Sequence, residues 1–182
     1  MKSLLTVLIL MCSLATYAAN VSLIDLSEIR STKLQKISKS LNELGEFMQD
    51  NVVLYNYAFV IHAKKASESM PNTIKQMIYS QGGAYGPTSA YASRLAVKKL
   101  DQHLESERKL IQDTYRDWDM DDEYMTSVMS AFEKYVTALT DNKKNLKFYK
   151  TGHDGVFYFA GGIAIYNDYT NEVLFVEIAH EE

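Results

Sequence analysis

The residues best suited to metal chemistry are the histidines. His103 and Glu107 are four residues apart, which would place them on one face of a helix. Catalytic zinc usually has three protein ligands, so folding would have to bring in His153 or His180 as the third. This set predicts a metal-assisted hydrolase as an alternative function. The simpler interpretation is a solvated helix face for His103 and polar turn or tail positions for the others, so we assign no metal site.

An acidic run resembles the start of a calcium loop. Asp117, Asp119 and Asp121 alternate as ligands do in such loops. The sixth and twelfth positions, which should be glycine and glutamate, are Asp122 and Val128. We therefore expect these acids to end one helix and begin the next, where negative charge complements the helix dipole.

Common catalytic and phosphate-binding motifs are missing from the sequence. It contains no G-x-S-x-G elbow, no H-E-x-x-H zinc motif and no glycine-rich phosphate loop. The single cysteine, Cys12, lies in the expected leader peptide. We predict no catalytic residues and no cofactor, and an enzyme is the less favoured class.

Tyrosines and turn acids are the best candidates for binding. Tyrosine occurs 13 times, and aromatic side chains of this kind are favoured at interface hot spots. Tyr85 lies in the glycine-rich segment 82–87, which is either a plain connector or a binding loop that presents this side chain. The predicted partner contacts are Tyr85, Asp154, Tyr166, Asp168 and Tyr169.

Residues 1–18 have the pattern of a secretory signal peptide. Lys2 precedes an apolar run of about 11 residues, and Thr16 and Ala18 fit a cleavage site. A membrane-spanning helix needs about 20 residues, so we expect export and no membrane span. The mature chain would contain no cysteine and no disulfide, which favours a bacterial periplasm or the cell exterior.

The charge of the chain excludes some partners. The net charge of the 182 residues is −4, and removal of the leader would make it −5. Nucleic-acid binding requires a basic patch or stripe, so we expect none. An acidic surface would instead steer the protein towards a basic protein partner.

Apolar periodicity predicts a largely helical first part. Residues 23–48 have helical spacing, and Pro71 fits the first turn of a short helix with Ser69 as its cap. Residues 52–63 are almost continuously apolar. A strand is an alternative there, but we favour a buried helix because no turn signal follows. Thr88 or Ser89 is expected to open a long helix that ends near Trp118, and a further helix should end at residues 141–142.

The character of the chain changes after Asn145. Segments 146–150, 156–166 and 173–179 have the composition of strands, separated by turn residues at 151–155 and 167–171. Gly161 and Gly162 suggest a bulge or a close backbone approach. Both faces of the 156–166 segment are apolar or aromatic. One face should pack on the helices, and the other would be covered within the domain, by a second copy in a homodimer, or by a foreign protein.

These patterns predict one domain over residues 19–182, with a helical body (19–145) and a β-rich tail (146–182). The fold class is α+β, mainly helical, with four to five helices and an antiparallel meander of about three strands. The leading functional hypothesis is an exported protein-binding module, such as an inhibitor or immunity-type protein that blocks an envelope-active enzyme or toxin. A chaperone-like or structural envelope protein is a further alternative.

Overall fold

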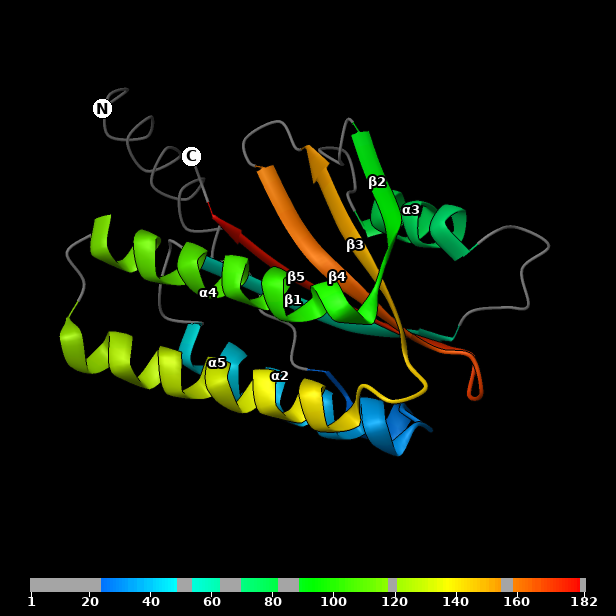
Figure 1. The fold of residues 1–182 in the computed structure, drawn as a ribbon, viewed down its shortest axis with the longest axis horizontal. Helices are drawn as coiled ribbons and strands as arrows, with labels where there is room; N and C mark the ends of the chain where they lie inside the picture. Colours follow the sequence, from blue (N-terminus) through cyan, green and yellow to red (C-terminus); the bar gives the residue numbers. More distant parts are fainter. Residues whose placement is uncertain are drawn as a thin grey trace, which may run out of the picture.

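The computed structural model describes residues 24–48, 54–62, 70–81, 89–117, 121–154 and 159–180. These residues form four α-helices and a five-stranded antiparallel sheet (Figure 1). The helices are α2 (Thr32–Met48), α3 (Met70–Gln81), α4 (Leu100–Asp117) and α5 (Asp122–Asn142). The strands are β1 (Leu54–His62), β2 (Ser89–Leu95), β3 (Lys147–Asp154), β4 (Phe159–Asn167) and β5 (Glu172–His180). Short 3-10 helices, η1 (Leu26–Glu28) and η3 (Val97–Lys99), precede α2 and α4. The predicted α+β fold is confirmed.

The sheet is larger than the predicted meander. Its strand order is β1-β5-β4-β3-β2, so the meander of β3, β4 and β5 forms the middle and an earlier strand is added at each side. The Gly161–Gly162 pair does not interrupt β4, because its register with β3 and β5 continues through both glycines. The expected turn at 151–155 is also wrong over most of its length, since β3 extends to Asp154.

Two helix predictions are wrong because these segments complete the sheet. Most of the 52–63 run is strand β1, which pairs with β5 over its whole length. Its β-branched and aromatic residues suit that pairing better than a helix. Residues 89–95 form β2 against β3, and the long helix begins only at Leu100.

The other helix predictions agree with the structure. The helix predicted at 23–48 is present from Thr32 onwards as α2. Pro71 is the second residue of α3, and Asp121 caps α5 by accepting a hydrogen bond from the Glu123 backbone N–H. The predicted buried stripe of α5 is present at Val128, Phe132, Tyr135 and Leu139. None of the described helices is both long enough and apolar enough to cross a bilayer.

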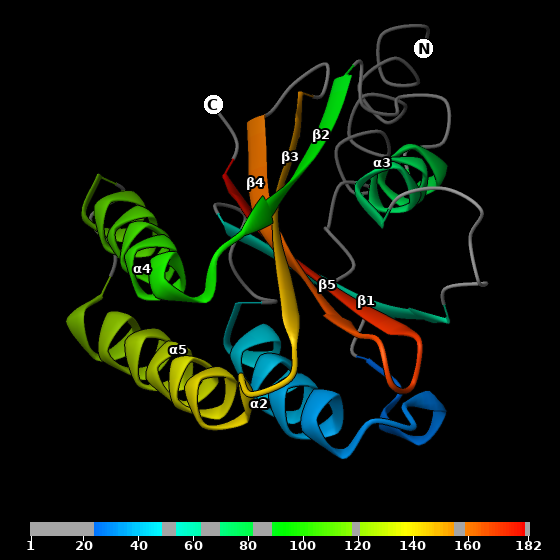
Figure 2. The ribbon, with the colours of Figure 1, turned by 45° about the vertical axis from the view of Figure 1, so that its right-hand side comes forward.

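The sheet is covered on both faces by helices of the same chain (Figure 2). The main core joins α2, α4 and α5 to one face, through residues such as Phe148, Ile163 and Ile165. A smaller core joins Ile74 and Ile78 of α3 to the opposite face, where Tyr149, Ala164 and Phe175 lie. The apolar outer face considered in the sequence is therefore packed against α3 where the structure describes it.

Candidate functional site

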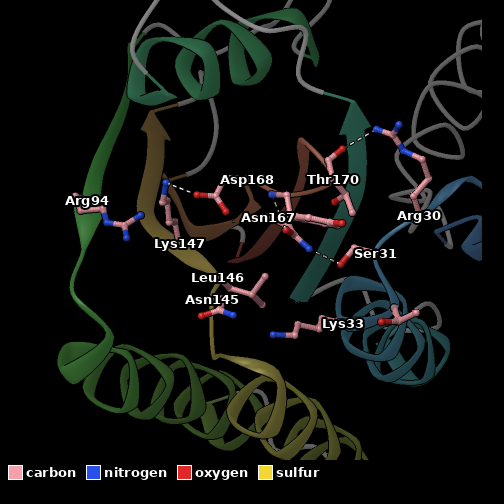
Figure 3. A pocket seen from close by; sticks show the side chains of 12 residues that line it. Arg30, Ser31, Lys33, Arg94, Asn145, Leu146, Lys147, Asn167, Asp168 and Thr170 are labelled. Carbon is pink, nitrogen blue, oxygen red and sulfur yellow. Dashed lines mark hydrogen bonds and ion pairs between the residues drawn. The ribbon is translucent and has the colours of Figure 1, made fainter.

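A pocket of about 770 Å³ lies at one end of the sheet, beside the first turn of α2. The end of β2, the start of β3 and the turn between β4 and β5 surround it (Figure 3). Four of its lining residues carry a positive charge, and we call it the basic pocket. Its lining is Arg30, Ser31, Thr32, Lys33, Arg94, Asn145, Leu146, Lys147, Asn167, Asp168, Tyr169 and Thr170.

One wall of the pocket is fixed by a contact between distant parts of the chain. Ser31 precedes α2, and its hydroxyl oxygen accepts a hydrogen bond from the Leu34 backbone N–H at 3.3 Å. The same oxygen accepts a bond from Asn167 Nδ2 at 2.7 Å. A single N-cap residue therefore begins the helix and ties the β4–β5 turn to it.

A buried carboxylate supports this wall from behind. Glu172, the first residue of β5, is fully buried. Its two oxygens accept hydrogen bonds from the backbone N–H groups of Arg30 (2.7 Å) and Ser31 (2.9 Å). Burial raises the pKa of Glu172, but the hydrogen bonds that it accepts and the charge of Arg30 more than offset this and hold the pKa below its usual value.

The opposite wall contains an ion pair. Lys147 Nζ lies 2.5 Å from Asp168 Oδ2 and 5.8 Å from the ring centre of Tyr166. Their hydrogen bond lowers the pKa of Asp168 and raises that of Lys147, so both side chains are charged at neutral pH. Both are well exposed, so this pair remains open to exchange with another ion.

The β4–β5 turn presents an aromatic side chain beside the pocket. Tyr169 is 96% exposed. Its backbone N–H donates to Asn167 Oδ1 at 3.0 Å, and the Tyr166 hydroxyl donates to Asn171 Oδ1 at 3.0 Å. Asn171 closes the turn with a φ of 59°, a left-handed conformation that asparagine tolerates better than most residues. A fixed backbone thus carries an exposed tyrosine.

The positive charges come from three separate segments. Arg30 and Lys33 flank the start of α2, Arg94 comes from β2 and Lys147 from β3. Figure 3 shows Arg94, Lys147 and Asp168 on one side of the pocket, with Ser31 and Asn167 on the other. The positive end of the α2 dipole adds to the potential. This arrangement can bind negatively charged or hydrogen-bond-accepting groups.

Three of the five predicted contact residues meet at this site. Asp168 and Tyr169 line the pocket, and Tyr166 lies behind Lys147. Asp154 is the last residue of β3, and Lys147, which lines the pocket, is the first, so Asp154 lies at the far end of the strand from the pocket. Tyr85 lies outside the described residues, as does the expected signal peptide at 1–18.

The histidines are not brought together into a metal site in the described part of the chain. His103 Nε2 does lie 3.1 Å from Glu107 Oε1 on α4, although the contact lacks hydrogen-bond geometry. His153 on β3 and His180 on β5 are separated by β4. Among the described residues, no group of three or more His, Cys, Asp or Glu side chains is placed to hold a metal ion. The acids that resemble the start of a calcium loop lie where the prediction put them, with Asp117 as the last residue of α4 and Asp121 as the N-cap of α5. Asp119 lies outside the described residues.

The four cations of the pocket were not singled out by sequence reasoning. Arg30, Lys33, Arg94 and Lys147 share no motif, and each looks like an ordinary surface charge in its own segment. The available signal was the turn composition at 167–171 and the change of character after Asn145. Both mark pocket edges, but neither indicates which other segments meet there.

Comparison with known proteins yields little for this site. No protein-family model matches the chain, and no curated protein is similar to it. Among the solved structures that match, the crystal structure of citrus MAF1 does so at a TM-score of 0.39 and 8% identity, covering 78% of this chain and 98% of that one. A match this distant carries no functional argument, so the function must be inferred from the site.

Proposed function

We propose that this protein is an exported protein-binding module whose contact surface is the β4–β5 turn with the adjoining basic pocket. The observation that carries the proposal is Tyr169, which is 96% exposed on a turn held by Asn167 and Asn171. A large aromatic ring on a fixed backbone loses little entropy when it is buried by a partner.

The proposed partner is an enzyme or toxin that acts at the cell envelope. The expected signal peptide would place both proteins in the same compartment. A projecting turn with one aromatic residue at its tip suits insertion into a concave site such as an active-site cleft. Binding there would block access of substrate, as an inhibitor or immunity protein does.

The test is capture of partners by the purified protein from envelope and secreted extracts, read by mass spectrometry. One stoichiometric partner whose capture falls at least about tenfold with Tyr169→Ala supports the proposal, since hot-spot truncations cost at least this much. Tyr91→Ala is the matched control, because Tyr91 is also exposed but lies on β2 opposite Gly152, away from the turn. Tyr85→Ala tests the 82–87 segment separately.

Three outcomes would contradict the proposal. Equal capture by the wild type and Tyr169→Ala would remove the turn from the contact surface. A broad set of weakly bound clients would indicate a chaperone-like protein instead. A partner that retains its full activity in the complex would leave the protein a binding module but refute inhibition.

A further inference from the structure

We infer that the basic pocket accepts an acidic segment of the partner protein, whose carboxylates bind to Arg94 and Lys147. This inference rests on the proposed function and specifies the chemistry of the contact. It differs from the expectation based on net charge, under which an acidic chain attracts a basic partner.

The basic pocket carries an excess of positive charge. The pocket lining contains four cations and a single carboxylate, Asp168, in a chain whose net charge is −4. Glu172 offsets Arg30 from behind but is fully buried and does not line the pocket. The pocket is therefore positively charged although the chain as a whole is negatively charged.

Distance decides which charge matters at contact. At physiological ionic strength, interactions between exposed charges are screened over about 8 Å. The net charge of the chain acts on a partner that is still approaching, and at distances beyond about 8 Å salt largely screens this interaction. Once a side chain enters the pocket, the cations of the lining are its nearest charges. The local potential therefore selects the segment that is bound.

The pocket already shows the chemistry that we infer. Lys147 binds the carboxylate of Asp168 at 2.5 Å, and that carboxylate belongs to the same exposed turn as Tyr169. A carboxylate of the partner would compete with Asp168 for Lys147 and would find Arg94 on the same side of the pocket (Figure 3). Arg94 is held with its guanidinium 5.1 Å from the ring centre of Tyr149, an arrangement that leaves its N–H edges available for a bidentate contact.

Size favours a peptide segment over a single small anion. A volume of about 770 Å³ falls within the range of ligand pockets that hold many atoms, and it is far larger than one phosphate or carboxylate needs. The cations are distributed around the pocket, on β2, on β3 and on both sides of the start of α2. The exposed ring of Tyr169 adds apolar contact area for the remainder of the segment.

The experiment measures binding of a fluorescent oligoglutamate peptide to the purified protein by anisotropy, over a range of salt concentrations. We expect saturable binding that weakens as salt increases. Arg94→Glu should weaken it about tenfold or more, as expected for loss of a charge-assisted contact. Asp168→Asn should strengthen it, because Lys147 is then free to bind the peptide. Lys109→Glu, an equal charge change at an exposed position of α4 outside the pocket, is the matched control.

Arg94→Glu and Asp168→Asn are expected to change peptide binding in opposite directions. Equal weakening by Arg94→Glu and Lys109→Glu would show a general charge effect and overturn it, and so would an absence of peptide binding. Inorganic phosphate that binds through Arg94 while oligoglutamate does not would identify a small-anion site and also overturn it. If the captured partner depends on Tyr169 but not on Arg94, the proposed function stands and this inference alone fails.

Discussion

Asn167 donates a hydrogen bond from Nδ2 to the hydroxyl of Ser31 at 2.7 Å, although 136 residues separate them in the sequence. This bond connects the turn that carries Tyr169 to Ser31, the N-cap residue of α2. The orientation of the proposed contact surface therefore depends on a helix cap. It also ties the β4–β5 turn, at the end of the sheet, to α2 while that turn presents exposed side chains.

Replacing Ser31 with alanine should destabilise the protein by about 2 kcal/mol, because both the cap of α2 and the partner of Asn167 are lost. Asn167→Ala should cost less, and the double variant should cost less than the sum, since the shared bond is lost only once. Urea denaturation measures all three. Ser40→Ala is the control, because its hydroxyl bonds the Lys36 carbonyl within α2. Strict additivity would show that the two side chains are not coupled.

Glu172→Gln should lower stability at neutral pH by about 2 kcal/mol, since a buried charged acceptor of two backbone N–H groups becomes neutral. The folded pKa of Glu172 is lowered relative to its usual value of 4.5, so its ionised form stabilises the fold. That contribution is fully present above the unfolded pKa and is lost as the pH falls through the folded pKa. The difference in melting temperature between the wild type and the variant should therefore shrink as the pH falls below 4.5.

The comparison needs an exposed carboxylate as its reference. Glu28→Gln, on η1, serves this purpose because Glu28 is exposed to solvent. A difference between the wild type and Glu172→Gln that stays constant down to strongly acidic pH would mean that the charge of Glu172 does not stabilise the fold.

Gly152→Ala should destabilise the protein by about 1 kcal/mol, the low end of the cost of overpacking, because the partly exposed Tyr91 ring can move aside. Gly152 is opposite Tyr91 in the β2–β3 register, and a Cβ at this position would collide with the tyrosine ring. The cost should fall sharply in a Tyr91→Ala background, because the obstructing ring is gone. Denaturation of the two single variants and the double variant tests this. An equal cost in both backgrounds would assign the effect to the glycine backbone.

The sequence predicted the elements with long, regular patterns and missed those defined by their neighbours. The stripe of α5 was readable because its periodicity extends over many residues, and the meander because turn residues separate segments of strand-like composition. Strand β2 was interpreted as helix because Leu95, its last residue, enters the same core as Leu100 and Leu104 of α4. These leucines pack into one core although they lie on a strand and a helix, and in the sequence their spacing resembles the apolar face of a single helix. The β1 segment was ambiguous because a continuous apolar run carries no period.

The candidate site shows a different limit. Asp168 and Tyr169 were predictable because turn chemistry is local. Arg94 and Lys33 were not, because they reach the pocket only when β2 pairs with β3 and α2 packs beside the β4–β5 turn. No feature within either segment distinguishes these cations from the other basic residues of the chain. The basic pocket is a property of the sheet order, which the sequence patterns do not specify.

The His103–Glu107 pair yields a prediction about stability and metal binding together. His103 Nε2 and both Glu107 oxygens are buried without a hydrogen bond of good geometry in the described structure. Burial first, and then the charge of Glu107, raise the pKa of Tyr135 on α5, which places a further buried polar side chain in the field of this carboxylate. A buried polar cluster with unsatisfied atoms contributes little stability.

Replacing both residues with apolar side chains, His103→Leu with Glu107→Met, should therefore leave the protein as stable as the wild type or more stable, by up to about 4 kcal/mol. Glu107→Met alone should be less stable than the double variant, because it leaves His103 buried without its neighbour. Thermal denaturation with and without added Zn²⁺ measures both effects. A melting temperature that Zn²⁺ raises in the wild type but not in the double variant would instead favour the metal-dependent alternative, with a third ligand outside the described residues.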